Sequence, residues 1–505
     1  MARTAHARRA ARRGVPVTPA RGGARWHAGR RRARALQPVP VRTERLWRPL
    51  AVVLGLVAVA TAVLLYANRE LAGDLFWLLA AGRYVDAHGA GAHDPFLTIA
   101  HGGHWYNQQW LSEWLLFQVQ RAGGLKLVSF AYALVLGATV APLAWGCRGR
   151  RLVLVLAAFA LFVGSAVCVL QPRAAGLSFL AFALVVTVVY AARRRRAWLF
   201  LLPPLFALWA NLHGAFLAGL LFAGLSALGA ALARRGGRRL PRIRLRPALP
   251  LAAATAAGAV ALLATPLGAG VFDYMRDIGQ NQALPLLTHE WLPTWQHPAA
   301  LALLVAFCAF ALFLHLAHPK PRPLAPALVA VGFALFALTA ARQAVWLGPV
   351  AFHLVRELGP RVRWRVPRRL ALPTGALAAA SLVAWWVGAP PAPAQPNLMT
   401  AGADYAAAHP PRHGRILAPT GTGSYMLWRH PHTPIVVDGR LERYSGHELM
   451  VAYRLLGGTE PSLRQLRRWH VGAVLTRNPH GVAVLRAHGF RLRARIGGSY
   501  YLVAP

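Results

Sequence analysis

Acidic side chains are scarce in this chain, and their positions show where chemistry could occur. The 505 residues include 15 aspartates and glutamates beside 57 lysines and arginines. Thirteen of the carboxylates fall in segments that we place on one side of a membrane, together with Arg173 and Arg342. A carboxylate can take a proton from a hydroxyl group, and the guanidinium fork matches the oxygens of a phosphate. These residue types could therefore act together on a compound that carries a phosphate.

The elements that must position these side chains are long apolar segments. A helix needs about 20 residues to cross a bilayer. Eleven segments reach or approach this length: Leu50–Ala67, Leu125–Trp145, Leu152–Leu170, Leu177–Ala192, Ala197–Leu212, Ala215–Ala233, Ala248–Ala264, Ala299–Leu316, Leu324–Ala340, Ala344–Val355 and Leu370–Val387. The sequence therefore predicts an α-helical polytopic membrane protein with about 11 transmembrane helices.

The arginines orient this bundle, because cationic connections near crossing ends stay in the cytoplasm. Alternate connections carry most of them, namely the tail before Leu50, Arg148–Arg151, Arg193–Arg196, Arg234–Arg246, Lys320–Arg322 and Arg361–Arg369. We therefore predict a cytoplasmic N-terminus, a multi-pass protein of the plasma membrane, and an outer face that holds all the carboxylates except Glu44 and Glu357. An odd number of crossings also exports the C-terminal residues.

Composition shifts divide the chain into four parts. Residues 1–48 are expected to be a disordered, arginine-rich cytoplasmic tail. Residues 49–389 form the membrane domain, with outer loops at 69–124 and 265–298, and residues 390–396 form a proline-rich linker. Residues 397–505 are predicted to be an extracytoplasmic α/β domain. Its expected strands are Arg415–Pro419, Pro434–Val437, Ala473–Leu475 and Ser499–Val503, and its expected helices are His447–Leu456, Pro461–Trp469 and Val482–His488.

Composition also excludes several classes of protein. An apolar content of 56% with many long apolar runs argues against a nucleic-acid-binding protein, despite the net charge of +42. The cysteines, Cys147, Cys168 and Cys308, lie in or beside crossings, so neither a disulfide framework nor a cysteine metal site is expected. No glycine-rich phosphate loop precedes a helix with its lysine.

The first outer loop contains two amphipathic stretches, Leu75–Val85 and Trp110–Val119. We expect both to lie along the membrane interface, where amphipathic helices and tryptophans favour the headgroup level. The tryptophans concerned are Trp77, Trp105, Trp110 and Trp114.

The same loop carries ordered short motifs. They are Asp74, Trp77 and Gly82 in the pattern Asp-x-x-Trp-x-x-x-x-Gly, then Asp94-Pro95-Phe96, then Trp110-Leu111-Ser112-Glu113. Further along stand Trp209-Ala210-Asn211-Leu212-His213-Gly214, His289-Glu290-Trp291, Ala341-Arg342 and Tyr425 to Arg440, which ends Val437-Asp438-Gly439-Arg440. In this order, from Leu50 to the end, the chain resembles a bacterial branch of the GT-C class of integral-membrane glycosyltransferases.

The resemblance implies transfer of a sugar from a polyprenyl-phosphate donor to an extracytoplasmic acceptor, with inversion at the anomeric carbon. It implies Asp74 as the base, Arg342 or Arg173 as the phosphate clamp, and Glu113 or Glu290 as a second acid or cation ligand. The motifs add Trp77, Asn211, His213, Tyr425, Asp438 and Arg440 as further site candidates. The partners are then the lipid-linked sugar, the bilayer and a glycan, lipid or protein acceptor. The resemblance specifies no cofactor, and a divalent cation is an open option.

The chain departs from the branch at Gln108 and Gln109, where an acid is often found. An alternative is therefore a catalytically inactive scaffold or lipid-glycan binding protein, and a third is a transporter of the lipid-linked sugar. Individual residues also have structural interpretations. Asp74 could cap a helix, Glu113 could pair with Arg121 or Arg342, His213 could be a hydrogen-bonded bundle residue, and Arg342 could reach the interface. Asp94 and Asp438 could simply form turns.

Overall fold

The computed structural model describes residues 44–67, 70–91, 93–166, 171–232, 245–281, 284–362, 394–459 and 464–505, together with 380, 383 and 385–388. Residues Arg45–Pro505 form one compact unit. Three predicted segments lie largely outside the described residues: the tail 1–48, the last crossing at 370–387 and the linker 390–396. These three assignments stay predictions.

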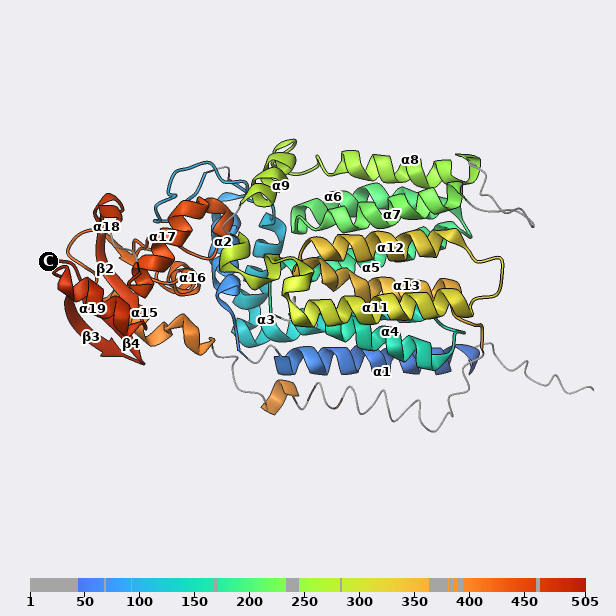
Figure 1. Cartoon of the computed structure of the whole chain (residues 1–505), viewed down its shortest axis with the longest axis horizontal. Helices are drawn as coiled ribbons and strands as arrows, with labels where there is room; N and C mark the ends of the chain where they lie inside the picture. Colours follow the sequence, from blue (N-terminus) through green and yellow to red (C-terminus); the bar gives the residue numbers. More distant parts are fainter. Residues whose placement is uncertain are drawn as a thin grey trace, which may run out of the picture. The chain divides into compact units, whose positions relative to one another are not determined.

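Helices make up most of the described chain before residue 359 (Figure 1). Four helices there are long and apolar enough to cross a bilayer: α1 (Glu44–Ala67), α3 (Trp110–Gly146), α5 (Ala174–Ala192) and α11 (Pro298–Ala317). Shorter apolar helices are α4 (Leu152–Ser165), η2 (Arg196–Leu201) with α6 (Leu202–Leu212), α7 (Phe216–Ala231), α8 (Leu245–Ala261) and α12 (Leu324–Thr339). These are the features of a helical membrane protein, whereas the count of eleven crossings stays a prediction.

The other elements of this helical part are shorter or more polar. They are α2 (Gly73–His88), α9 (Gly270–Gln280), α10 (Leu284–Leu287), η3 (His289–Trp291), η4 (Thr294–Gln296), η5 (Ala341–Trp346) and α13 (Leu347–Leu358).

The two ends of the bundle differ in charge. Arg173 is the N-cap residue of α5 and Arg193 is its C-cap residue, so these arginines stand a full helix length apart. Arg193 pairs with Glu357 at 2.7 Å, at the end where Arg150 also donates to the backbone of α13. Arg173 instead contacts the carboxylates of the opposite end. Among the described residues, Arg150 and Arg193 thus lie at one end of the bundle, and the carboxylates that contact Arg173 lie at the other.

The prediction that Leu75–Val85 lies along the membrane interface is wrong. This stretch belongs to α2, and Trp77 is only 7% exposed because the C-terminal part of the chain covers the helix. Phe76, for example, packs against the rings of Tyr425 and Trp428 at centroid distances of 5.3 and 5.2 Å. Trp105, 2% exposed, is also buried in protein instead of standing at headgroup level.

The second amphipathic stretch opens α3, which is broken at Gly123 and Gly124. Gly124 has φ +68°, a conformation that favours glycine. The break separates the loop portion of α3 from the apolar portion that begins at Leu125, where the sequence predicts a crossing. Glu113 and the membrane-length segment are therefore on different sides of a kink.

Gly82 explains the spacing of the loop motif. A Cβ atom there would lie 2.2 Å from the backbone oxygen of Glu113 and 2.7 Å from Cβ of Phe117. Neither neighbour can rotate away, because one is backbone and the other is the first atom of its side chain. Only glycine lets α2 approach α3 this closely.

We expect Gly82→Ala to destabilise the protein by about 1–3 kcal/mol, the usual cost of overpacking. Thermal unfolding of the detergent-solubilised chain measures the effect. The matched control is Gly224→Ala in α7, where a new Cβ meets nothing within 4 Å. This control should unfold at the wild-type temperature or above it. Equal unfolding temperatures for Gly82→Ala and wild type would disprove the packing argument.

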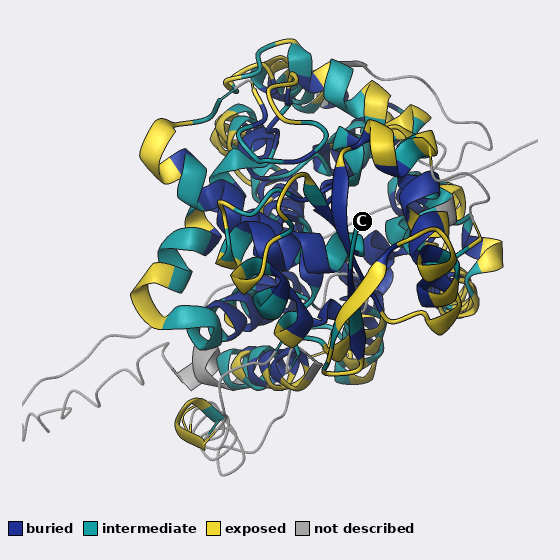
Figure 2. Cartoon of the chain, turned by 90° about the vertical axis from the view of Figure 1, so that its left-hand side faces the viewer, coloured by how far each residue is buried: buried dark blue, intermediate teal, exposed yellow. Residues whose placement is uncertain are grey.

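The C-terminal part, residues 396–505, contains one four-stranded sheet with strand order β1-β2-β4-β3. β1 (Arg415–Leu417) is parallel to β2 (Val471–Thr476), and β4 (Ser499–Val503) is antiparallel to β2 and to β3 (Arg491–Ile496). The helices here are η6 (Pro396–Leu398), α15 (Thr400–Ala408), α16 (Thr420–Arg429), η7 (Leu441–Arg443), α17 (Gly446–Gly457), α18 (Arg464–Arg468) and α19 (Pro479–Ala487). β2 is buried throughout, whereas the edge strand β3 is mostly exposed (Figure 2).

Most of the elements predicted in this part are present. Three predicted strands coincide with β1, β2 and β4, and three predicted helices overlap α17, α18 and α19. The strand predicted at Pro434–Val437 is wrong, since Ile435 forms only an isolated bridge with Ile416. The α/β composition is therefore as expected, although this part belongs to the same compact unit as the helices before it.

The C-terminal part rests directly on the start of α2. A Cβ at Gly73 would lie 2.6 Å from Cα of Gly421, so α2 and α16 touch backbone to backbone. A Cβ at Gly439 would lie 2.9 Å from the indole ring of Trp77. The residues around Asp74 are thus enclosed by segments from both parts of the chain.

Candidate functional site

One cavity brings together most of the predicted site residues. It has a volume of about 290 Å³, at the lower end of the range for small-molecule sites, and we call it the Asp74 cavity. Its polar lining comprises Asp74, Gln109, Arg173, His213, Tyr274, Thr288, Glu290, Arg342, Gln343 and Glu442. Its apolar lining includes Trp77, Phe179, Leu217, Met275, Ile278, Phe336 and Trp346.

Helix ends converge on this cavity. Asp74 is in the first turn of α2, Arg173 caps α5, and His213 follows the last residue of α6. Glu290 and Arg342 come from the short turns η3 and η5. Because neighbouring crossings alternate in direction, residues far apart in the sequence meet at one end of the bundle.

Asp74 offers a carboxylate to the interior of the cavity. Its side chain keeps 50% of its surface accessible and lies 3.7 Å from a guanidinium nitrogen of Arg173. Desolvation in the cavity raises the pKa of Asp74 above its usual value, against the opposing charge of Arg173. The helix-cap interpretation of Asp74 is wrong, because Ala72 is the N-cap residue and no side-chain cap forms. A raised pKa makes the ionised carboxylate a stronger base toward a hydroxyl proton.

Arg173 and Arg342 share one carboxylate. Glu290 lies 3.2 Å from Nη1 of Arg173 and 3.9 Å from Nη1 of Arg342. The guanidinium of Arg342 also stacks 4.3 Å from the ring centre of Trp291. Nε of Arg173 is buried and has no hydrogen-bond partner among the described residues. Two fixed guanidinium groups, one with an unused donor, can bind the oxygens of a phosphate.

His213 is held as a neutral imidazole. The hydroxyl of Ser178 lies 3.0 Å from its Nδ1, and the backbone N–H of Ala215 donates to the same atom. Trp209 in turn donates to the Ser178 hydroxyl at 2.9 Å, and this hydroxyl donates a hydrogen bond to Nδ1. Desolvation, with the charges of Arg342 and Arg173, lowers the pKa of His213 to about 3. His213 is thus both hydrogen-bonded in the bundle and exposed to the cavity.

Glu442 is a cavity residue that the sequence analysis missed. It belongs to η7 in the C-terminal part, and its neighbours Gly439 and Leu441 also line the Asp74 cavity. Desolvation raises the pKa of Glu442 to about 7. The nearest sequence signal was the preceding Asp438-Gly439-Arg440 motif, which marked the right segment but the wrong side chains.

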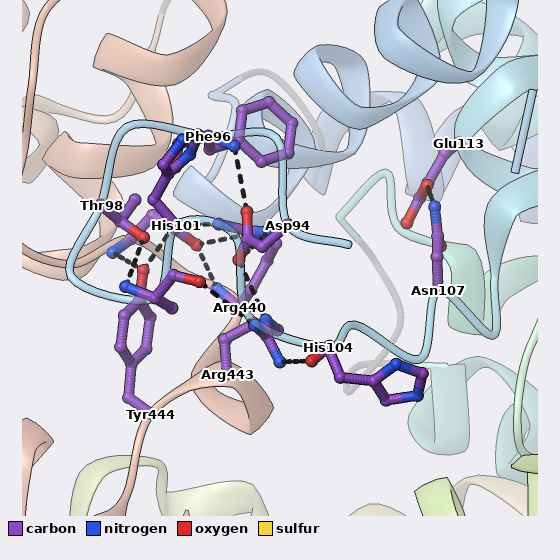
Figure 3. Close-up of polar contacts among 12 residues, drawn as sticks. Asp94, Phe96, Thr98, His101, His104, Asn107, Glu113, Arg440, Arg443 and Tyr444 are labelled. Atoms are coloured by element: carbon purple, nitrogen blue, oxygen red, sulfur yellow. Dashed lines mark hydrogen bonds and ion pairs between the residues drawn. The ribbon is translucent and has the colours of Figure 1, made fainter. Parts of the chain in front are cut away.

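Glu113 lies outside the lining of the Asp74 cavity and is fully buried. Nδ2 of Asn107 donates to Oε2 of Glu113 at 2.8 Å, and Oε1 has no partner among the described residues (Figure 3). The alternative that Glu113 pairs with Arg121 or Arg342 is wrong, since Arg121 pairs with Asp86 at 3.3 Å and Arg342 lies 3.9 Å from Glu290. Glu113 therefore fixes Asn107 of the first outer loop through this hydrogen bond. Its role in catalysis stays a prediction.

Asp438 and Arg440 form a buried ion cluster instead of lining the cavity. Arg440 is 0% exposed, and its guanidinium contacts Asp438 at 2.7 Å and Asp94 at 3.0 Å. Arg443 approaches Asp94 at 3.0 Å (Figure 3). Tyr444 donates to Asp438 at 2.7 Å. The motifs around residues 94 and 438 are thus two halves of one junction between the first outer loop and the C-terminal part.

The turn predicted at Asp94 is confirmed, since the backbone N–H of Phe96 donates to Oδ1 of Asp94 at 3.1 Å. Phe96 and Trp105 then pack on the guanidinium of Arg440, at 4.5 and 5.0 Å from their ring centres. This loop is therefore shaped to hold a buried arginine.

Two further candidates fix helices in place. The hydroxyl of Tyr425 donates to Asp404 at 3.1 Å. Asn211 accepts from the indole of Trp110 at 2.7 Å and donates to Ala264 at 2.8 Å. Neither Tyr425 nor Asn211 lines the Asp74 cavity.

No group of three or more histidine, cysteine, aspartate or glutamate side chains with the geometry of a metal site occurs within the described ranges. No protein-family model matches the chain, and no curated protein matches it significantly.

Proposed function

We propose that this chain is a membrane glycosyltransferase of the GT-C type, which moves a sugar from a polyprenyl-phosphate donor to an extracytoplasmic acceptor. The observation that carries the proposal is the composition of the Asp74 cavity. One accessible carboxylate with a raised pKa and two arginines face the same space. That pairing provides a base for a hydroxyl group and positive charge for a phosphate.

In the proposed reaction, Asp74 takes the proton of the acceptor hydroxyl while the oxygen attacks the anomeric carbon of the sugar. The bond between that carbon and the phosphate oxygen breaks, and the electron pair leaves with the polyprenyl phosphate. The phosphate then carries one more negative charge than in the donor. Arg173 and Arg342 stabilise this charge more strongly in the transition state than in the donor complex, which lowers the barrier.

The walls of the cavity suit a donor that is part lipid and part sugar phosphate. Leu217 and Phe336 line it from α7 and α12, and the side chain of Leu217 is 46% exposed on the apolar surface of the bundle. A prenyl chain can pass from the bilayer along such a wall, while the sugar lies beside Asp74 and Glu442. This arrangement brings a lipid donor and a polar acceptor together at one place.

The proposal includes the finer topology predicted from charge: about 11 crossings, a cytoplasmic N-terminus, and the Asp74 cavity on the outer face of the plasma membrane. Arginine placement supports this orientation. The gathering of carboxylates at the opposite end of the bundle from Arg193 is consistent with it.

The test is incorporation of radiolabelled sugar into membranes that contain the chain, with a panel of polyprenyl-phosphate sugars supplied as donors. We expect incorporation with at least one donor and none in membranes that lack the chain. If no donor in the panel supports incorporation, the transferase proposal fails.

Gln109 favours a second candidate, a protein that binds the lipid-linked sugar without transferring it. Its side chain lines the Asp74 cavity at a position where related motifs often carry an acid. Such a protein would retain labelled polyprenyl-phosphate sugar during purification and release it unchanged. Formation of free polyprenyl phosphate distinguishes the transferase from this binding protein.

Glu442 makes the proposed activity dependent on pH. Its pKa of about 7 means that its side chain is neutral below this pH and negatively charged above it. The donor is a phosphodiester whose single charge is constant across this range. Its KM should therefore rise several-fold as the pH passes from 6 to 8, because the new carboxylate repels the phosphate.

The profile of KM against pH in the wild type and in Glu442→Gln checks this prediction. The variant should keep a low KM up to pH 8, since glutamine stays neutral. A rise in KM that is identical in the two proteins would assign the titration to another group.

A further inference from the structure

A second cavity lies at the arginine-rich end of the bundle, opposite the Asp74 cavity. It has a volume of about 1150 Å³, and six arginines and one glutamate line it. Arg148 and Arg150 come from the connection after α3, Arg193 and Arg194 follow α5, and Arg356 and Arg361 belong to α13 and the residues after it. We call this space the arginine cavity.

The chain has too few carboxylates to neutralise these arginines. Glu357 is the glutamate in the lining, and it is already engaged by Arg193 at 2.7 Å. The sequence contains no aspartate or glutamate in residues 1–43, 114–272, 291–356 or 358–403. Apart from Glu357, the described residues that line the arginine cavity therefore supply no negative charge.

The arginines also lie close enough to repel one another. Desolvation and the charge of Arg194 lower the pKa of Arg148, and desolvation and the charge of Arg361 lower the pKa of Arg150. The positive-inside tendency accounts for arginines on this side of the membrane. This tendency does not explain why arginines from three separate segments line one cavity, where they repel one another.

The rest of the lining is apolar and faces the bundle. Leu50 and Val53 of α1 and Pro142 of α3 form one wall, and Trp145 and Trp198 stand beside the arginines. Trp198 is 47% exposed, a typical position for a tryptophan at the headgroup level of a bilayer. A ligand for this site would have a negatively charged head and an apolar tail.

We propose that the arginine cavity binds the phosphate headgroup of an anionic membrane phospholipid, with its acyl chains along the wall formed by α1 and α3. The proposal does not depend on the transferase function, because the two cavities lie at opposite ends of the bundle. Free phosphate is the other source of the same anion, and the experiment separates the two.

The test uses the full chain in uncharged detergent and counts bound lipids by native mass spectrometry. The probes are dioctanoyl phosphatidylglycerol, dioctanoyl phosphatidylcholine and inorganic phosphate. The site variant is Arg148→Gln with Arg194→Gln, both exposed residues of the lining. The control variant is Arg151→Gln with Arg196→Gln, which removes the same charge at the same end from residues outside this lining.

We expect phosphatidylglycerol to bind the wild type and the control variant alike and the site variant at least about tenfold more weakly, as for the loss of two basic contacts to an anionic lipid. Phosphatidylglycerol should also raise the unfolding temperature of the wild type more than that of the site variant. Equal weakening in the two variants, or equal binding of phosphatidylcholine, would overturn the proposal. Binding of inorganic phosphate as tight as that of the lipid would overturn the lipid as the source.

Discussion

Arg440→Met is expected to lower the stability of the protein by about 3–5 kcal/mol, the typical cost of removing one partner from a buried ion pair. Arg440, Asp94 and Asp438 have no exposed side-chain surface. Without the guanidinium, two carboxylates would remain close together in a desolvated junction. The C-terminal part should then separate more readily from the first outer loop.

Thermal unfolding in detergent and limited proteolysis measure this effect. Arg477→Met is the control, because Arg477 is an exposed arginine just after β2. Adding Asp438→Asn to Arg440→Met should recover part of the lost stability, since Asp94 then keeps its ion pair with Arg443 and Asp438 no longer carries a charge. If Arg440→Met unfolds at the same temperature as Arg477→Met, the ion cluster does not hold the two parts together.

Asp74→Asn is expected to lower kcat by about 10² to 10⁴, the range that a positioned general base contributes. Asparagine has nearly the same shape, so the KM of the donor should change little. The transfer assay on purified protein measures both constants. Asp86→Asn is the control, because Asp86 is on the same helix and outside the lining of the Asp74 cavity. A kcat for Asp74→Asn equal to that of Asp86→Asn would remove Asp74 as the base.

The sequence predicted the helical bundle well because apolar runs of membrane length leave few other folds. It also predicted that Asp74, Arg173, Glu290 and Arg342 share one end, because the sidedness of charge follows from alternating helix directions. The structure then adds that these four side chains line one cavity. The sidedness of charge could not establish this, because it shows at which end of the bundle a residue lies but not which residues it contacts.

The wrong predictions for α2 and Arg440, and the omission of Glu442, have a common cause: contacts between segments that are far apart in the sequence. The periodicity of α2 is that of an interfacial helix, but α16 covers it and converts its apolar face into a core. Arg440 was placed in the site through its motif, whereas its partner Asp94 lies 346 residues away. Glu442 has no motif of its own and reaches the Asp74 cavity only through that junction.

The edge strand β3 was missed for a local reason. Its sequence, Arg-Leu-Arg-Ala-Arg-Ile, alternates charged with apolar residues, and four of its six residues are exposed in the edge position. Charged side chains on an edge strand discourage pairing with other chains. They also weaken the apolar signal by which strands are predicted.

Measuring both products of a single reaction tests the transferase proposal most directly. Purified chain in liposomes receives a polyprenyl-phosphate sugar labelled in the sugar and in the prenyl chain, together with an acceptor extract. If the chain is a transferase, free polyprenyl phosphate and glycosylated acceptor appear in equal amounts, and Asp74→Asn stops the formation of both. Donor that stays bound and intact, or products that form equally well with Asp74→Asn, would contradict the proposal.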